Sequence, residues 1–142
     1  MEIEDEVVAL TDAVRSFLNG PERYATLATV NPDGLPQQTV MWFSLLDDDT
    51  IMMNTKRGRR KDRNLLRDPR ASICVEGGEQ YVTITGKITM TEDPVRAQAD
   101  IHALAVKYSG QEKGDEEVAN VFGLQERVTI LLSIDHVDAN EI

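Results

Sequence analysis

The sequence predicts a mainly β (α+β) protein in which six antiparallel strands form a closed or nearly closed barrel with flanking helices. Three observations favour this class. Short segments rich in β-forming residues alternate between apolar and polar side chains with a period of two. These segments follow one another in hairpin order with few long crossovers. The 142 residues contain no interdomain linker, so we expect residues 1–142 to form a single domain.

The first elements are a helix and a hairpin. Residues 6–19 place apolar side chains along one helical stripe, which ends at Gly20-Pro21. Residues 23–30 and about 37–46 alternate as strands do. The sequence Asn31-Pro32-Asp33-Gly34 between them is a strong turn signal. An amphipathic helix followed by a β-hairpin is therefore expected.

The middle of the chain predicts three further strands and one short helix. Residues 51–55 form the third expected strand. Residues 62–66 suit a short helix that ends before Pro69, because a residue before proline disfavours helical backbone. Two glycines separate the next two expected strands, at 71–76 and 80–91.

The last third of the chain begins with a helix. Asp93 is a good N-cap and Pro94 a good first residue for a helix that runs to about 108. Residues 109–117 are rich in glycine, lysine and acids, which predicts a mobile loop. A final strand is expected at about 126–135, and His136 falls in the tail behind it.

Charge is distributed unevenly along the chain. Residues 56–70 carry eight basic and two acidic side chains, whereas the whole chain has a net charge of −10. A concentrated basic segment on an acidic molecule attracts an anion to a defined place. The acidic remainder and the lack of interleaved aromatic residues argue against nucleic acid as the partner.

Several other features narrow the choice of site. The one cysteine, Cys74, lies in an apolar run and is expected to be a buried strand residue. The two histidines, His102 and His136, have no metal-binding spacing, so no metal site is expected. The acidic N-terminus and the absence of a long apolar run predict a cytoplasmic protein with no membrane partner.

Spaced motifs between residues 20 and 92 carry a resemblance to a known family. They are Gly34-x-Pro36, Trp42-Phe43, Asn54-Thr55, Arg59-x-Lys61-x-Arg63-Asn64-Leu65 and Asp68-Pro69-Arg70. In this pattern the chain resembles the pyridoxamine-phosphate-oxidase-like flavin and deazaflavin proteins, and among them the small F420-dependent oxidoreductases. That resemblance implies an FMN-binding-like, six-stranded split barrel. It also implies a homodimer with two cofactor clefts at the subunit interface.

The resemblance and the residue chemistry together suggest which side chains bind the cofactor. Arg59 and Lys61 follow a strand and open a short helix, where backbone N–H groups favour a phosphate. Polar groups on neighbouring strands could bind a ring edge or a polyol chain. The expected cofactor-binding residues are Gln37, Thr39, Val40, Met41, Asn54, Thr55, Arg59, Arg60, Lys61, Gln80 and Tyr81. Gln80 and Tyr81 are expected to reach the cleft of the second subunit.

The expected cofactor is F420, with FMN as the alternative. F420 carries a longer anionic chain than FMN, which suits a basic segment larger than one phosphate requires. We therefore expect an F420-dependent oxidoreductase that transfers a hydride between the reduced deazaflavin and a small-molecule substrate. An FMN-dependent oxidase and a noncatalytic flavin- or F420-binding protein are the other candidates.

The sequence contains no pairing of a nucleophile with a base, so no catalytic residue is predicted. A hydride-transfer protein can leave the difficult chemistry to its cofactor. Trp42 is the only tryptophan. Since large aromatic side chains usually pack, we expect Trp42 in the core rather than on a cleft wall.

Overall fold

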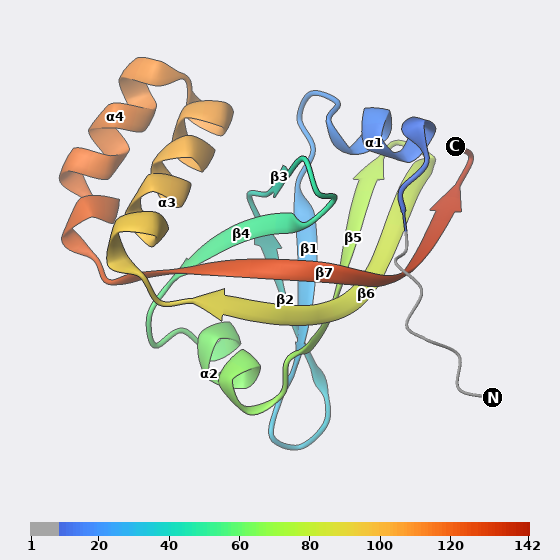
Figure 1. The fold of residues 1–142 in the computed structure, drawn as a ribbon, viewed down its shortest axis with the longest axis horizontal. Helices are drawn as coiled ribbons and strands as arrows, with labels where there is room; N and C mark the ends of the chain where they lie inside the picture. The colour runs from blue at the N-terminus through green and yellow to red at the C-terminus, as the bar shows by residue number, and fades with distance from the viewer. Residues whose placement is uncertain (1–8) are drawn as a thin grey trace.

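The structure, a computed structural model, describes residues 9–142. Within this range a single seven-stranded sheet has the strand order β2-β1-β5-β6-β7-β4-β3, and all of its pairings are antiparallel. The sheet curls into a half barrel with helices around it (Figure 1). The predicted α+β split-barrel class is confirmed, although the sheet has seven strands where six were predicted.

The extra strand comes from the segment predicted as one strand at 37–46. In the structure this segment is divided into β2 (Pro36–Met41) and β3 (Ser44–Leu45). β2 pairs with β1 (Ala25–Val30), whereas β3 pairs with β4 (Ile51–Lys56) at the far edge of the sheet. The chain therefore changes its pairing partner at Trp42 and Phe43.

Three long strands complete the sheet. They are β5 (Arg70–Gly77), β6 (Gln80–Thr91) and β7 (Arg127–Asn140). The pairing of β6 with β7 shifts register between Thr85 and Gly86, and a Cβ on Gly86 would lie 1.8 Å from the carbonyl oxygen of Ser133. Only glycine permits this close approach, and such a bulge increases the local bend of a strand. Because β7 continues to Asn140, His136 lies in the strand and not in a tail.

Two helices differ in length from the predicted segments. Helix α1 (Asp12–Leu18) begins at its N-cap Thr11, whose hydroxyl accepts a hydrogen bond from the Val14 N–H. Residues 6–8 of the predicted helix lie outside the described residues. Helix α2 (Arg60–Arg67) includes residues 62–66 as predicted and packs beside β1.

The predicted mobile loop at 109–117 is wrong. Helix α3 (Pro94–Ser109) begins at the Asp93 N-cap as predicted, but Gly110 then leads directly into helix α4 (Gln111–Asn120). A Cβ on Gly114 would lie 2.8 Å from the backbone nitrogen of Val106, so the two helices pack closely at this glycine. Tertiary packing of this hairpin, extended by η1 (Phe122–Leu124), outweighs the weak helix propensity of the segment.

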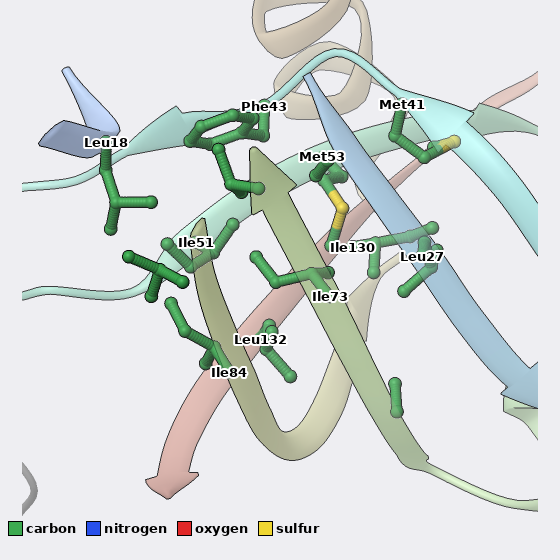
Figure 2. Packing of buried hydrophobic residues seen from close by; sticks show 14 of the residues in the cluster. Leu18, Leu27, Met41, Phe43, Ile51, Met53, Ile73, Ile84, Ile130 and Leu132 are labelled. Atoms are coloured by element: carbon green, nitrogen blue, oxygen red, sulfur yellow. The ribbon is translucent and has the colours of Figure 1, made fainter. Parts of the chain in front are cut away.

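The core fills the concave side of the curled sheet. Figure 2 shows Leu27, Met53, Ile73, Ile84 and Ile130 converging there from five strands. Residues of β5 alternate between buried and exposed positions, so Ile73 and Val75 are buried while Cys74 between them is exposed. The expectation of a buried cysteine is therefore wrong, because Cys74 has the outward phase of the strand.

The helices lie around the rim of the sheet. Figure 1 shows the α3–α4 hairpin at one end of the half barrel, beside the first residues of β7, and α1 near the other end of that strand. Across residues 9–142, no helix is both long and apolar enough to cross a membrane.

Candidate cofactor cleft

A cleft of about 280 Å³ opens where β2, β4 and the start of α2 meet the α3–α4 hairpin and the start of β7. Strands, helices and loops from distant parts of the sequence all contribute to it. Its lining residues are Thr39, Val40, Met41, Trp42, Asn54, Thr55, Arg59, Lys61, Ile101, Leu104, Phe122 and Arg127. Seven of the predicted cofactor-binding residues are therefore brought together: Thr39, Val40, Met41, Asn54, Thr55, Arg59 and Lys61.

One part of the cleft is strongly cationic. Arg59, Lys61 and Arg127 all line it, and none of them forms a salt bridge with a carboxylate among residues 9–142. Burial, together with the charges of Arg59 and Arg127, lowers the pKa of Lys61. Burial and, secondarily, the charge of Arg59 lower the pKa of Arg127 to about 10. Both shifts have the same physical cause, because burial and neighbouring positive charge disfavour a cation, and a bound anion would relieve that cost.

The start of α2 adds backbone donors to these cations. Arg59 is the N-cap of α2, and its side chain makes no capping hydrogen bond. The first N–H groups of a helix have no partner within the helix and are suited to a phosphate or carboxylate. The carboxylate of Asp62 does not neutralise the cleft, because it is buried against Arg57 at 2.9 Å and accepts the Gly58 N–H at 2.7 Å.

Aromatic and aliphatic side chains form another wall. The Trp42 ring stacks on Tyr108 with centroids 5.3 Å apart and an interplanar angle of 6°, and Phe122 meets it edge-on. The Tyr108 hydroxyl donates to the Arg23 carbonyl at 2.7 Å and accepts the Phe43 N–H at 3.1 Å. Trp42 is half-buried at this wall while Phe43 is fully buried in the core. The prediction of a core position is therefore wrong for Trp42.

Polar groups from the strands lie between these two regions. Thr39 and Thr55 contribute hydroxyl groups, and the Gln37 amide nitrogen donates to the Thr39 hydroxyl at 2.9 Å. Gln37 is not part of the lining, and its amide oxygen accepts a hydrogen bond from the Thr29 hydroxyl at 3.2 Å. Gln37 therefore holds the Thr39 hydroxyl in place from outside the cleft.

Three predicted residues lie away from this cleft in the same chain. Arg60 is exposed at the first position of α2 and is not part of the lining. Gln80 and Tyr81 begin β6, whose opposite end at Thr91 pairs with Thr129 beside the cleft. At about 3.3 Å per residue, the length of β6 separates Gln80 and Tyr81 from this cleft. Their contact with the cleft of a second subunit stays a prediction.

Besides Trp42, sequence reasoning missed four lining residues. Ile101 and Leu104 come from α3, Phe122 from η1 and Arg127 from β7. Arg127 had a usable signal, because it is the only lysine or arginine after Lys113 and opens an apolar strand. The other three have apolar side chains that the sequence cannot distinguish from ordinary core residues.

Comparison with known proteins places the cleft in a family context. Residues 10–140 match the family described as pyridoxamine 5'-phosphate oxidase. Curated relatives named pyridoxine/pyridoxamine 5'-phosphate oxidase from Azorhizobium caulinodans and Bradyrhizobium diazoefficiens are 34% and 30% identical over 95 residues. Each alignment covers 66% of this chain and 43% of the relative, so the chain spans less than half the length of these relatives.

Solved structures share the fold. The conserved hypothetical protein Rv2991 from Mycobacterium tuberculosis has a TM-score of 0.76 and 27% identity, over 98% of this chain and 88% of that one. An F420 reductase has a TM-score of 0.68 and 24% identity, over 87% of this chain and 94% of that one. Since the family match extends over almost the whole described chain, the protein belongs to the pyridoxamine 5'-phosphate oxidase family.

Proposed function

We propose that this protein is an F420-dependent oxidoreductase acting on a small organic substrate. The observation that carries the proposal is the division of the cleft between three cations, which have no carboxylate partner among residues 9–142, and a wall of Trp42 and Phe122. A ligand that fits has an anionic end and a planar, largely apolar end. Flavins and deazaflavins are of this kind, and when bound they supply hydride transfer.

The donor set suits such a cofactor. Arg59 and Arg127 offer planar guanidinium groups and Lys61 a compact ammonium, the groups that bind phosphate oxygens most strongly. Strand β2 is at an edge of the sheet, so the backbone N–H and C=O groups on its free side are available for a ring edge. Thr39 and Thr55 add hydroxyl groups for a polyol chain.

The lining also limits what the chain itself contributes to catalysis. Among its twelve described residues there is no carboxylate, histidine or cysteine. These side chains therefore bind and orient the reactants and exclude water from the apolar wall. Because the lining holds no carboxylic acid, histidine or cysteine and Lys61 is assigned to the anion, we expect a proton to come from solvent, the substrate or another subunit.

The choice of F420 over FMN rests on charge beyond the cleft. Arg60 and Arg63 are exposed on α2 next to the lining residues Arg59 and Lys61 and form no salt bridge with a described carboxylate. A ligand that ends in one phosphate cannot use all of these charges. The longer anionic chain of F420 can extend along α2.

FMN is the second candidate cofactor. The curated relatives are named pyridoxine/pyridoxamine 5'-phosphate oxidase, which favours an FMN-dependent oxidase. The proposal further includes a homodimer whose subunits share the cofactor clefts, with Gln80 and Tyr81 facing the partner's cofactor, and a cytoplasmic location.

The test is a titration of the purified protein with F420 and, separately, with FMN. Trp42 is the only tryptophan and lies on the cleft wall, so quenching of its fluorescence reports binding directly. We expect micromolar or tighter F420 binding. The double variant Arg59→Ala/Lys61→Ala should bind at least about 100-fold more weakly, since each lost charge-assisted hydrogen bond contributes about 1.5–3 kcal/mol.

A second double variant separates the two cofactors. Arg60→Ala/Arg63→Ala removes exposed charges outside the lining and should weaken F420 binding while leaving FMN binding unchanged. Tight FMN binding with weak F420 binding would contradict the F420 proposal and support an FMN-dependent oxidase. Absence of binding to either cofactor would reject both functions.

A further inference from the structure

We propose that Asn54 is a positioning residue for Arg127, holding its guanidinium in the cleft while leaving its positive charge unneutralised. The inference rests on the proposed function, since the anion that Arg127 serves is the cofactor's. It refines the sequence-based expectation that Asn54 itself binds the cofactor.

Arg127 is held on two sides by neutral groups. Its Nε donates to the Asn54 amide oxygen at 2.9 Å, and its Nη1 donates to the Gln125 amide oxygen at 2.8 Å. The guanidinium carbon lies 5.0 Å from the centroid of the Phe122 ring. Nη2 has no hydrogen-bond partner among residues 9–142. These contacts fix the plane of the guanidinium and leave donors for a ligand.

The Asn54 amide has one orientation that satisfies its neighbours. Asn54 is buried, and its amide nitrogen donates to the Ala97 carbonyl at 2.9 Å and to the Thr129 hydroxyl at 3.4 Å. The carbonyl of Ala97 can only accept, so the nitrogen must face it and the amide oxygen must face Arg127. Both ends of the amide are therefore engaged by protein groups.

The same network extends to helix α3. The Thr129 hydroxyl donates to Asp100 at 2.7 Å, and Asp100 forms a salt bridge with Arg96 at 3.3 Å. The carboxylate of Asp100 therefore pairs with Arg96 on the same helix and not with Arg127. Helix α3 orients Asn54, and Asn54 orients Arg127.

An amide suits this role better than a carboxylate. A carboxylate at position 54 would accept the same Nε–H but would form an ion pair and cancel the charge that attracts the anion. An apolar side chain at position 54 would leave the positive charge of Arg127 in place but would no longer hold its guanidinium in a fixed orientation. The two replacements therefore fail for different reasons, which makes the proposal testable.

The experiment compares Asn54→Asp and Asn54→Leu with the wild type. NMR of ¹⁵N-labelled protein follows the Arg127 Nε–H group, assigned by its loss in Arg127→Lys, and cofactor titrations follow FMN and F420 separately. In the wild type we expect a slowly exchanging Nε–H signal. Asn54→Leu should abolish the protection of the Arg127 Nε–H from solvent exchange. It should also weaken the binding of each cofactor about 10-fold. Asn54→Asp should keep the signal and still weaken binding at least as much.

Thr129→Val is the matched control. It removes a buried hydroxyl from the same network but leaves the Asn54 bonds to Ala97 and Arg127 in place, so both readouts should stay near wild type. Unchanged Nε–H protection in Asn54→Leu would overturn the proposal. Wild-type cofactor affinity in Asn54→Asp would also overturn it. This second variant tests the proposal if Asn54→Leu does not fold.

The two proposals can fail separately. If the wild type binds neither cofactor, the proposed function is rejected. The Arg127 Nε–H comparison in the ligand-free protein then still decides whether Asn54 positions Arg127.

Discussion

Arg57 and Lys61 lie four residues apart in the basic segment, yet their side chains have different partners. Arg57 forms salt bridges with Asp62 and Glu92, whereas Lys61 is buried in the cleft and has no carboxylate partner in the described part of the chain. Arg67 donates to the Val30 carbonyl and so ties α2 to β1. At the scale of residues, partners decide which of the similar basic side chains are available to a ligand.

Asp68 and Arg70 allow a pH prediction at this scale. Hydrogen bonds from the Arg70 side chain and backbone, with Arg70 Nη2 2.8 Å from Asp68 Oδ2, lower the pKa of Asp68 from 3.8 to about 2. A lowered pKa in the folded state stabilises the fold above the unfolded pKa. This contribution is lost as the pH falls from about 4 towards about 2.

The variant Arg70→Gln should therefore raise the pKa of Asp68 towards 3.8, as followed by NMR of the carboxyl carbon. The Asp48 carboxyl is the internal control, because hydrogen bonds from Thr50 and not from an arginine lower its pKa. Equal pKa values of Asp68 in the wild type and the variant would show that Arg70 does not stabilise the carboxylate.

Among the elements, the α3–α4 hairpin matters most for the cleft, because Ile101, Leu104 and Phe122 all belong to it or follow it directly. Its packing depends on Gly114, where a Cβ would meet the backbone of Val106 and Ala105 at 2.8–2.9 Å. These neighbouring atoms belong to the backbone, so they cannot move aside as the end of a flexible side chain could.

Gly114→Ala should lower the free energy of unfolding by about 1–3 kcal/mol, despite the better helix propensity of alanine, because the hairpin is overpacked. Urea denaturation followed by circular dichroism measures this change. Lys113→Ala, at the neighbouring exposed position, should stay within about 0.5 kcal/mol of the wild type. A stabilised Gly114→Ala protein would contradict the close packing.

For the whole molecule, the convex side of the sheet is a candidate contact surface for a second copy. Gln38, Ala28, Ser72 and Thr85 are paired in register across β2, β1, β5 and β6 and form a row without charge. A hollow of about 440 Å³ on these strands is lined by several small side chains, including Ala28 and Ser72. Apart from Arg70, the residues that line this hollow carry no charge, which suits contact between subunits.

We expect sedimentation velocity to show that the wild type is a dimer at micromolar concentration. Ser72→Glu should shift the protein to the monomer, because each copy would place one negative charge in the contact. Ser16→Glu, on the exposed side of α1, adds the same charge away from this surface and should remain dimeric. If the clefts are shared, Ser72→Glu should lose cofactor affinity together with the dimer. A monomeric wild type would exclude the shared cleft.

Much of the fold followed from local patterns. The hairpin of β1 and β2, the helix after Asp93 and the buried phase of β6 depend on alternation, turns and caps within a few residues. Predictions failed where neighbours in space decided the outcome. Residues 111–120 form a helix because they can pack on α3, and Trp42 leaves the core because the chain changes pairing partner there.

Local patterns in the sequence were enough to predict most of the strands in chain order, the basic segment and the motif around Arg59 and Lys61, because these features depend on neighbouring residues. Tertiary structure alone decided that Arg127 joins them, since the hydrogen bond from Arg127 to Asn54 spans 73 residues. It also decided which cations lack carboxylate partners. The partners of individual charged side chains depend on residues that are distant in the sequence, so local periodicity does not reveal them.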